Sequence, residues 1–215
     1  MEPGDRDVPG IDVRWLSSDQ DGLLEHLREL GLEITAEAPR IAFPSGDLEI
    51  LSVNKATSAA RKAPDRLELN PGRNEPSPVA PPSPPGFDLI ATGWATVDIE
   101  RAASAFPGTT FAKAPPDDLL GARAWVTEPT NATGIVLLEP ATEGRLAAFL
   151  ARHGEGPAAL YLAVPLKPDG GTGRRPRASA TPRGGPFGAE LLVHASSREG
   201  PWLLVATRDA RPATG

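Results

Sequence analysis

The feature that most constrains the fold of this 215-residue chain is an internal repeat. In the first copy, a strand-like stretch over 11–17 precedes a helix marked by leucines at helical spacing, and Gly31 ends that helix. Three short strands are expected next, over 32–36, 40–43 and 48–53. The order is one strand, one helix and three strands, written βαβββ, and it recurs with a period of about 75 residues.

The second copy of the βαβββ unit begins at Phe87. Alternation predicts a strand over 89–97, and Asp98 is placed to cap a short helix over 99–106. Further strands are expected over 109–113, 122–127 and 134–139, and then a helix over 142–153. This copy therefore has the same order of elements as the first.

A third, incomplete copy makes up the C-terminal part. Its strands are expected over 159–165, 189–195 and 202–207, and a loop rich in Gly, Pro and Arg (167–185) stands where the helix should be. The patterns predict an α+β fold in which repeated βαβββ modules form a curved, mostly antiparallel sheet with helices outside. The expected segments are an N-terminal module (1–53), a Pro-rich linker (54–86), a second module (87–140), a helix with the incomplete third module (141–208) and a tail (209–215).

The proposed linker is the poorest segment for folding. Its second half, 75–86, contains six prolines in twelve residues. Proline cannot donate a backbone hydrogen bond to a sheet and favours the extended polyproline II conformation. We therefore expect this half to be extended and weakly packed.

Composition excludes several classes of function. The chain has no cysteine, which removes disulfides, thiolate nucleophiles and cysteine-ligated metals. A net charge of −6 gives no electrostatic reason to bind nucleic acid or an anionic membrane. The N-terminus has neither the basic nor the apolar region of a signal peptide, so a cytoplasmic location is expected. No phosphate-binding loop, dinucleotide fingerprint or nucleophile elbow is present.

Several strings in this repeat are similar to those of one known superfamily. The pair most similar is Ile135 to Pro140 and Ala148 to Pro157, which resembles the stretch that links the two modules of methylmalonyl-CoA-epimerase-type proteins. Residues 97–102 are similar to the strand-to-helix junction of that family, and 47–51 to its module-ending strand. The chain thus resembles the glyoxalase, or vicinal-oxygen-chelate, superfamily over about two thirds of its length. The resemblance implies paired modules that curve into a cup.

The resemblance also implies where a divalent metal would be bound, and there the chain departs from the family. The family places a histidine at the start of each module's first strand, and the matching positions are Ala91, Ala159 and Val13 or a neighbour of it. Ala and Val cannot replace an imidazole nitrogen. Acidic residues remain at Glu139 and Glu49. No bound metal and no cofactor are therefore expected.

Strand alternation predicts what the cup would present instead. If Ala91, Ala159 and Val13 face inward, then the small residues at 93, 95 and 163 do so as well, beside Trp15 and Tyr161. This arrangement describes either an apolar pocket with aromatic walls or an ordinary filled core.

Two functions remain open. The favoured one is a metal-free protein that binds a small hydrophobic or aromatic molecule, with Trp15, Tyr161, Glu139 and His194 as ligand-binding residues, and a homodimer is compatible with it. The alternative is a divalent-metal-dependent isomerase, lyase or dioxygenase whose ligands have moved to Glu139, Glu49 and His194. The missing histidines favour binding over catalysis.

Overall fold

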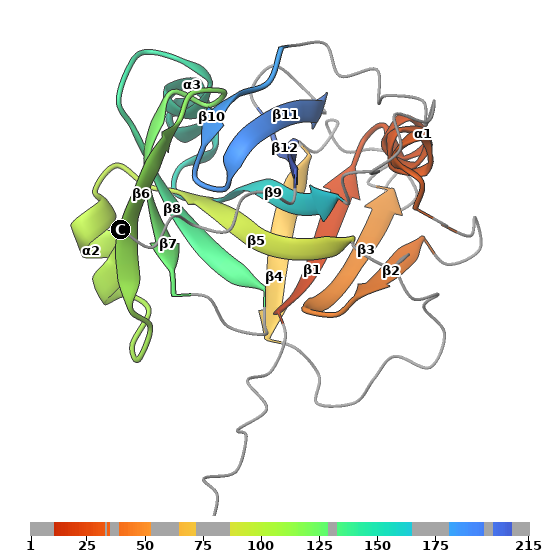
Figure 1. Ribbon diagram of the computed structural model, residues 1–215, viewed down its shortest axis with the longest axis horizontal. Coiled ribbons are helices and arrows are strands. Elements are labelled where there is room, and N and C mark those ends of the chain that lie inside the picture. The colour runs from red at the N-terminus through yellow and green to blue at the C-terminus, as the bar shows by residue number, and fades with distance from the viewer. Residues whose placement is uncertain are drawn as a thin grey trace, which may run out of the picture.

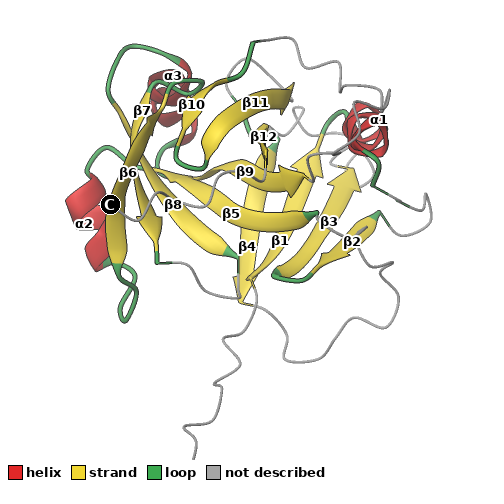
Figure 2. Cartoon of the chain, viewed as in Figure 1, coloured by secondary structure: helices red, strands yellow, loops and turns green. Residues whose placement is uncertain are grey.

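A computed structural model describes most of the chain (Figure 1). The described residues are 11–32, 34, 39–52, 65–71, 87–128, 133–164, 181–195 and 200–207. They form a strongly curved eight-stranded sheet, a second sheet of four strands and three short helices (Figure 2).

The eight-stranded sheet contains both C-terminal repeats. Its strands, in spatial order, are β10 (Arg183–Gly185), β11 (Gly188–Ala195), β12 (Trp202–Thr207), β9 (Gly156–Val164), β5 (Asp88–Ala95), β8 (Gly134–Pro140), β7 (Ala122–Thr127) and β6 (Phe111–Asp117). Read outward from the centre, the halves β5-β8-β7-β6 and β9-β12-β11-β10 have the same order. In each half the first strand pairs in parallel with the last, and the halves join through antiparallel β5 and β9. The predicted fold class, repeated modules in a curved and mostly antiparallel sheet, is confirmed.

The four-stranded sheet belongs to the N-terminal unit. Its order is β2 (Arg40–Phe43), β3 (Gly46–Ser52), β1 (Ile11–Ser17) and β4 (Arg66–Pro71). The pairing of β1 with β3 is parallel, as in the other two units. Of the strand expected over 32–36, Leu32 and Ile34 are buried but lie in no strand, and the other residues are outside the described part.

Strand β4 was not expected from the sequence. It lies within 54–86, the expected linker, and pairs antiparallel with β1. The alternation in Arg66, Leu67, Glu68 and Leu69 is typical of an edge strand, but it is short and stands among segments rich in Pro and Gly. The proline-rich stretch 75–86 is outside the described residues.

Local chemistry defines the helix ends. In α1 (Gln20–Leu30), the Asp19 carboxylate accepts a hydrogen bond from the Gly22 N–H, and Gly31 ends the helix at φ 100°. Asp98 caps α2 (Ile99–Ser104) by accepting from the Arg101 N–H at 2.9 Å. The third helix, α3 (Arg145–His153), follows β8 and carries Leu146 and Phe149 toward the sheet.

The two faces of the eight-stranded sheet are covered differently. On the outer face, α2 packs on β8 in the first half. In the second half, no described residues between β9 and β10 form a helix, and the N-terminal sheet and α1 cover that face instead. Leu160 and Leu162 of β9 and Leu203 and Val205 of β12 pack there with the core of the N-terminal unit. The N-terminal unit thus stands where a helix of the third repeat would be.

The loop expected over 167–185 contains β10 at its end, and its residues up to 180 are outside the described part. Within the described residues, no helix has the length and apolar character needed to cross a membrane.

Candidate functional site

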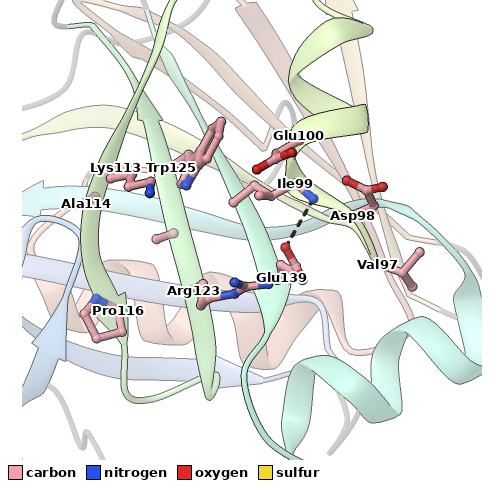
Figure 3. A pocket seen from close by; sticks show the side chains of 11 residues that line it. Val97, Asp98, Ile99, Glu100, Lys113, Ala114, Pro116, Arg123, Trp125 and Glu139 are labelled. Carbon is pink, nitrogen blue, oxygen red and sulfur yellow. Dashed lines mark hydrogen bonds and ion pairs between the residues drawn. The ribbon is translucent and has the colours of Figure 1, made fainter.

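A hollow of about 510 Å³ opens on the outer face of the sheet, between α2 and strands β6 and β7 (Figure 3). Its apolar lining includes Ile99 and Val97 at the start of α2 and Trp125 on β7. Val97 is 63% exposed, unusually high for a large apolar side chain. The remaining lining residues are Asp98, Glu100, Lys113, Ala114, Pro116, Arg123, Ala124 and Glu139.

The strand register places the functional groups of the hollow in two rows. Lys113 on β6 pairs with Trp125 on β7, which in turn pairs with Leu137 on β8. Two residues along β7, Arg123 pairs with Glu139 of β8. Residues directly opposite one another in antiparallel strands share a face, so the Trp125 ring has a cation across the ladder and another along its own strand. Figure 3 shows Lys113 and Trp125 side by side.

Glu139 fixes one wall of the hollow. Its carboxylate accepts a hydrogen bond from the Ile99 N–H at 3.2 Å and is ion-paired with Arg123. The Glu139 side chain is largely buried, at 15% exposure, whereas that of Arg123 is 64% exposed. The carboxylate therefore ties the start of α2 to β8.

Lys113 also lines the hollow, and unlike Arg123 it is not ion-paired with a described carboxylate. Its side chain is exposed, and no carboxylate among the described residues lies within ion-pair distance of it. Glu100 is also exposed and faces the hollow from α2. The site thus combines an aromatic surface with a lysine available to an anionic group.

The four residues predicted to bind ligand lie in different parts of the molecule. Glu139 lines the hollow. Trp15 on β1 is fully buried in the core between the two sheets, and Tyr161 on β9 is fully buried in the inner core of the large sheet. The backbone of His194 pairs with Leu203 on β12, and its side chain is outside the described residues. The structure does not bring Trp15, Tyr161 and Glu139 together.

The inner face of the large sheet is closely packed. Ala91, Ala95, Ala159 and Tyr161 belong to one core cluster. They therefore share one face of the sheet, as the strand alternation predicted. A Cβ atom added to Gly93 would lie 2.8 Å from Leu138 Cδ1 and 3.0 Å from Ala159 Cβ. Side chains therefore fill the space around Gly93.

The two glutamates of the alternative metal site do not converge. Glu49 is on β3 of the four-stranded sheet, where Arg14 donates to it at 2.8 Å. Glu139 is on β8 of the other sheet, paired with Arg123. Among the described residues, no group of three or more His, Asp and Glu side chains could hold a metal ion.

The sequence analysis did not single out Trp125 and Lys113. The signal available was the alternation of 122–127, which puts Arg123 and Trp125 on one face and Ala122 and Ala124 on the other. The approach of α2 to this face is a tertiary contact that the alternation does not contain.

Comparison with known proteins gives matches among solved structures. Methylmalonyl-CoA epimerase from Mycobacterium tuberculosis is 24% identical, over 55% of this chain and 86% of the epimerase, with a TM-score of 0.46. A variant of the Streptomyces coelicolor epimerase in complex with 2-nitronate-propionyl-CoA is 19% identical, over 55% of this chain and 95% of that one, with a TM-score of 0.44.

A third match covers more of the chain. A variant of 4-hydroxymandelate synthase from Streptomyces coelicolor is 13% identical, over 95% of this chain and 71% of the synthase, with a TM-score of 0.38. No protein-family model matches the sequence, and no curated protein matches it at a significant level.

Proposed function

We propose that this protein binds a small planar organic anion in the hollow between α2, β6 and β7, and that it does so without a metal ion. The observation that carries the proposal is the pairing of Lys113 with Trp125 at the edge of that hollow. The sequence analysis expected a small hydrophobic or aromatic ligand; the proposal keeps the aromatic ligand, adds a negative charge to it, and retains only Glu139 of the expected site residues.

Trp125 supplies the surface for a flat ligand. Its ring is half-buried and packs from one side against the cluster formed by α2 and β8, which restricts its motion. A ring held in this way loses little conformational entropy when a planar molecule stacks on it.

Lys113 supplies the charge. An anionic group on the ligand would lie beside the ammonium, whereas the charge of Arg123, two residues along β7, is already paired with Glu139. Asp98, Glu100 and Glu139 also line the hollow and disfavour a ligand with more than one negative charge. The geometry therefore favours a monoanion.

Calorimetric titration with a series of aromatic monocarboxylates and their neutral carboxamides tests the proposal. We expect the carboxylates to bind and the carboxamides to bind several-fold more weakly, because an exposed ion pair contributes about 0.2–1 kcal/mol. The difference should shrink as salt is added. Lys113→Gln should remove it, and Trp125→Leu should weaken both series.

Arg66→Gln is the matched control, because Arg66 is exposed and paired with Glu68 on the four-stranded sheet. It should leave binding unchanged. The proposal is wrong if no member of the series binds, or if Lys113→Gln and Arg66→Gln have the same effect. Because Trp125 also packs against α2, the stability of Trp125→Leu has to be measured beside its affinity.

A further inference from the structure

The two outermost strands of the large sheet, β6 and β10, approach one another and nearly close it into a barrel. Directly after β6, the Asp118 N–H donates a hydrogen bond of 3.0 Å to the Gly184 carbonyl of β10. This contact, together with the side chains beneath it, is called the seam. None of the residues of the seam lines the hollow.

Three acidic groups are buried at the seam. Asp117 ends β6, Glu190 is on β11 and Tyr161 is on β9, and each has no exposed surface. The Tyr161 hydroxyl donates to Asp117 Oδ2 at 2.7 Å. The Tyr161 ring also contacts Phe187, which lies in the turn between β10 and β11, with 5.3 Å between ring centroids.

Hydrogen bonds decide which group carries the negative charge. Asp117 accepts from the Leu119 and Leu120 N–H groups at 3.0 and 2.9 Å, in addition to Tyr161. Glu190 accepts only from the Phe187 N–H, at 2.9 Å, and among the described residues its Oε2 atom is buried without a partner. Three donors stabilise a carboxylate better than one, so Asp117 is the ionised group and Glu190 the protonated one.

The pKa values of these groups follow the same order. Burial, together with the charge of Asp117, raises the pKa of Glu190 to about 8. Burial also raises the pKa of Asp117, but hydrogen bonds from Tyr161 and from the two N–H groups lower it. Burial and Asp117 raise the pKa of Tyr161 well above its usual value, so the phenol stays protonated while Glu190 ionises.

The protonated Glu190 side chain is held inside the hairpin of β10 and β11. A Cβ atom at Gly185 would collide with its carboxyl group, so the backbone of β10 lies directly against that group. A negative charge formed there has no room for water on the β10 side and faces the charge of Asp117. Such a charge is costly unless the hairpin moves.

Few other charges lie close enough to offset this one. On β10, Arg183 pairs with Glu190 in the ladder, but its side chain is exposed and forms no ion pair with a described residue. On the other side, Glu190 pairs with Ala206 of β12. Asp118 beside the seam is exposed, and its carboxylate raises the pKa of Asp117.

The geometry points to a proton-dependent closure of the sheet, in which the seam between β6 and β10 is held shut by the protonated Glu190 and opens when that proton is lost. Opening would separate the β10–β11 hairpin from β6 and admit water to Asp117 and Tyr161. None of its three acidic groups lines the hollow, so the closure does not require a ligand there.

Nuclear magnetic resonance of the full chain from about pH 6 to pH 9.5 tests the closure. The Glu190 carboxyl carbon should titrate near pH 8. Over the same range, hydrogen exchange of the Asp118 N–H, corrected for base catalysis, should accelerate by up to about tenfold per pH unit below the midpoint and level off above it, because the carboxyl ionises at a lower pH in the open state and one proton is linked to opening. In Glu190→Gln, which keeps an acceptor for the Phe187 N–H, this acceleration should be absent.

Two further variants make the test specific. Asp117→Asn removes the facing charge and should move the midpoint to lower pH. Glu143→Gln, an exposed residue after β8, should behave as the wild type. The inference is wrong if Glu190 titrates at the usual pH of a glutamate, or if the Asp118 N–H accelerates equally in Glu190→Gln. It is also wrong if magnesium or calcium ions protect the seam above pH 8, because the pair of carboxylates would then be a cation site.

Discussion

Tyr161 on β9 and Asp117 at the end of β6 are joined by a hydrogen bond of 2.7 Å in the interior of the large sheet. The two residues come from different halves of that sheet, so this bond connects the two repeats through their side chains. Tyr161 was expected to wall a pocket, and here its hydroxyl is committed to a buried carboxylate.

Tyr161→Phe should lower the free energy of unfolding by about 1–3 kcal/mol, because the variant leaves a buried acceptor of Asp117 without its donor. Urea unfolding at pH 7 measures the change. In an Asp117→Asn background the same substitution should cost less. A loss within about 0.5 kcal/mol would show that the bond contributes little to stability.

Gly93→Ala tests whether the inner face is filled. The added methyl group would meet Leu138, Ala159 and Tyr161 at 2.8 to 3.1 Å, and we expect a loss of about 1–3 kcal/mol in unfolding free energy. Gly144→Ala is the control, since its nearest contact would be an ordinary 3.7 Å. If Gly93→Ala is as stable as the wild type, the inner face has spare room and a pocket beside Tyr161 becomes the better explanation.

Trp15→Ala should act on stability rather than on binding in the hollow. The side chain is fully buried between the two sheets, and removing it should cost about 3–5 kcal/mol of unfolding free energy. Trp15→Phe is the milder variant to use for binding assays, and it should bind the carboxylate series as the wild type does. Weaker binding by a stable Trp15→Phe protein would return Trp15 to the ligand site.

Glu155 should support stability in mild acid. Hydrogen bonds from Arg101, from the Thr96 hydroxyl and from the Val97 N–H lower the pKa of Glu155 from 4.5 to about 2. A carboxylate with a lowered pKa stabilises the fold fully above its unfolded value and loses that effect as the pH falls through the folded value. Thermal unfolding of Glu155→Gln should therefore depend less steeply on pH between about 4.5 and 2 than that of the wild type.

The corresponding substitution Glu143→Gln should leave that slope unchanged, because Glu143 is exposed and forms no hydrogen bond or ion pair with another described residue. Equal slopes in the wild type and in Glu155→Gln would show that these contacts do not persist in acid.

Removal of metal should not change the stability of the protein. The positions that the sequence resemblance aligns with metal-binding histidines are Ala91, Ala159 and Val13 or its neighbour, and Glu49 and Glu139 lie in different sheets, each paired with an arginine. Thermal melts with and without a chelator, beside metal analysis by mass spectrometry, measure this. Near-stoichiometric zinc, iron, nickel or cobalt that is lost in His194→Ala or Glu139→Ala would establish the metalloenzyme instead.

Local patterns predicted most elements of the fold. The strands β7 and β12 occur at the expected residues, and α2 begins at Ile99, directly after Asp98. These elements were predictable because alternation and capping depend on neighbours a few residues away. The strand β4 was not, since its stability comes from pairing with β1, which is far from it in sequence.

The candidate site was predictable only in part. Glu139 could be assigned to a strand end, but its partners, Arg123 and the Ile99 N–H, come from two other elements. For Trp15 and Tyr161, alternation correctly predicts burial on an inner face without showing whether that face is open or filled. That difference depends on the side chains packed across from them, such as Leu138 opposite Gly93.

Residue types and short-range spacing were enough to predict the repeat, the α+β class and the absence of cysteine chemistry. The tertiary structure decided the rest. It placed the N-terminal sheet over the face that lacks a helix, set Lys113 beside Trp125 under α2, and brought Asp117 and Glu190 together at the seam. These contacts join residues far apart in the chain, and a one-dimensional pattern carries no record of which faces meet.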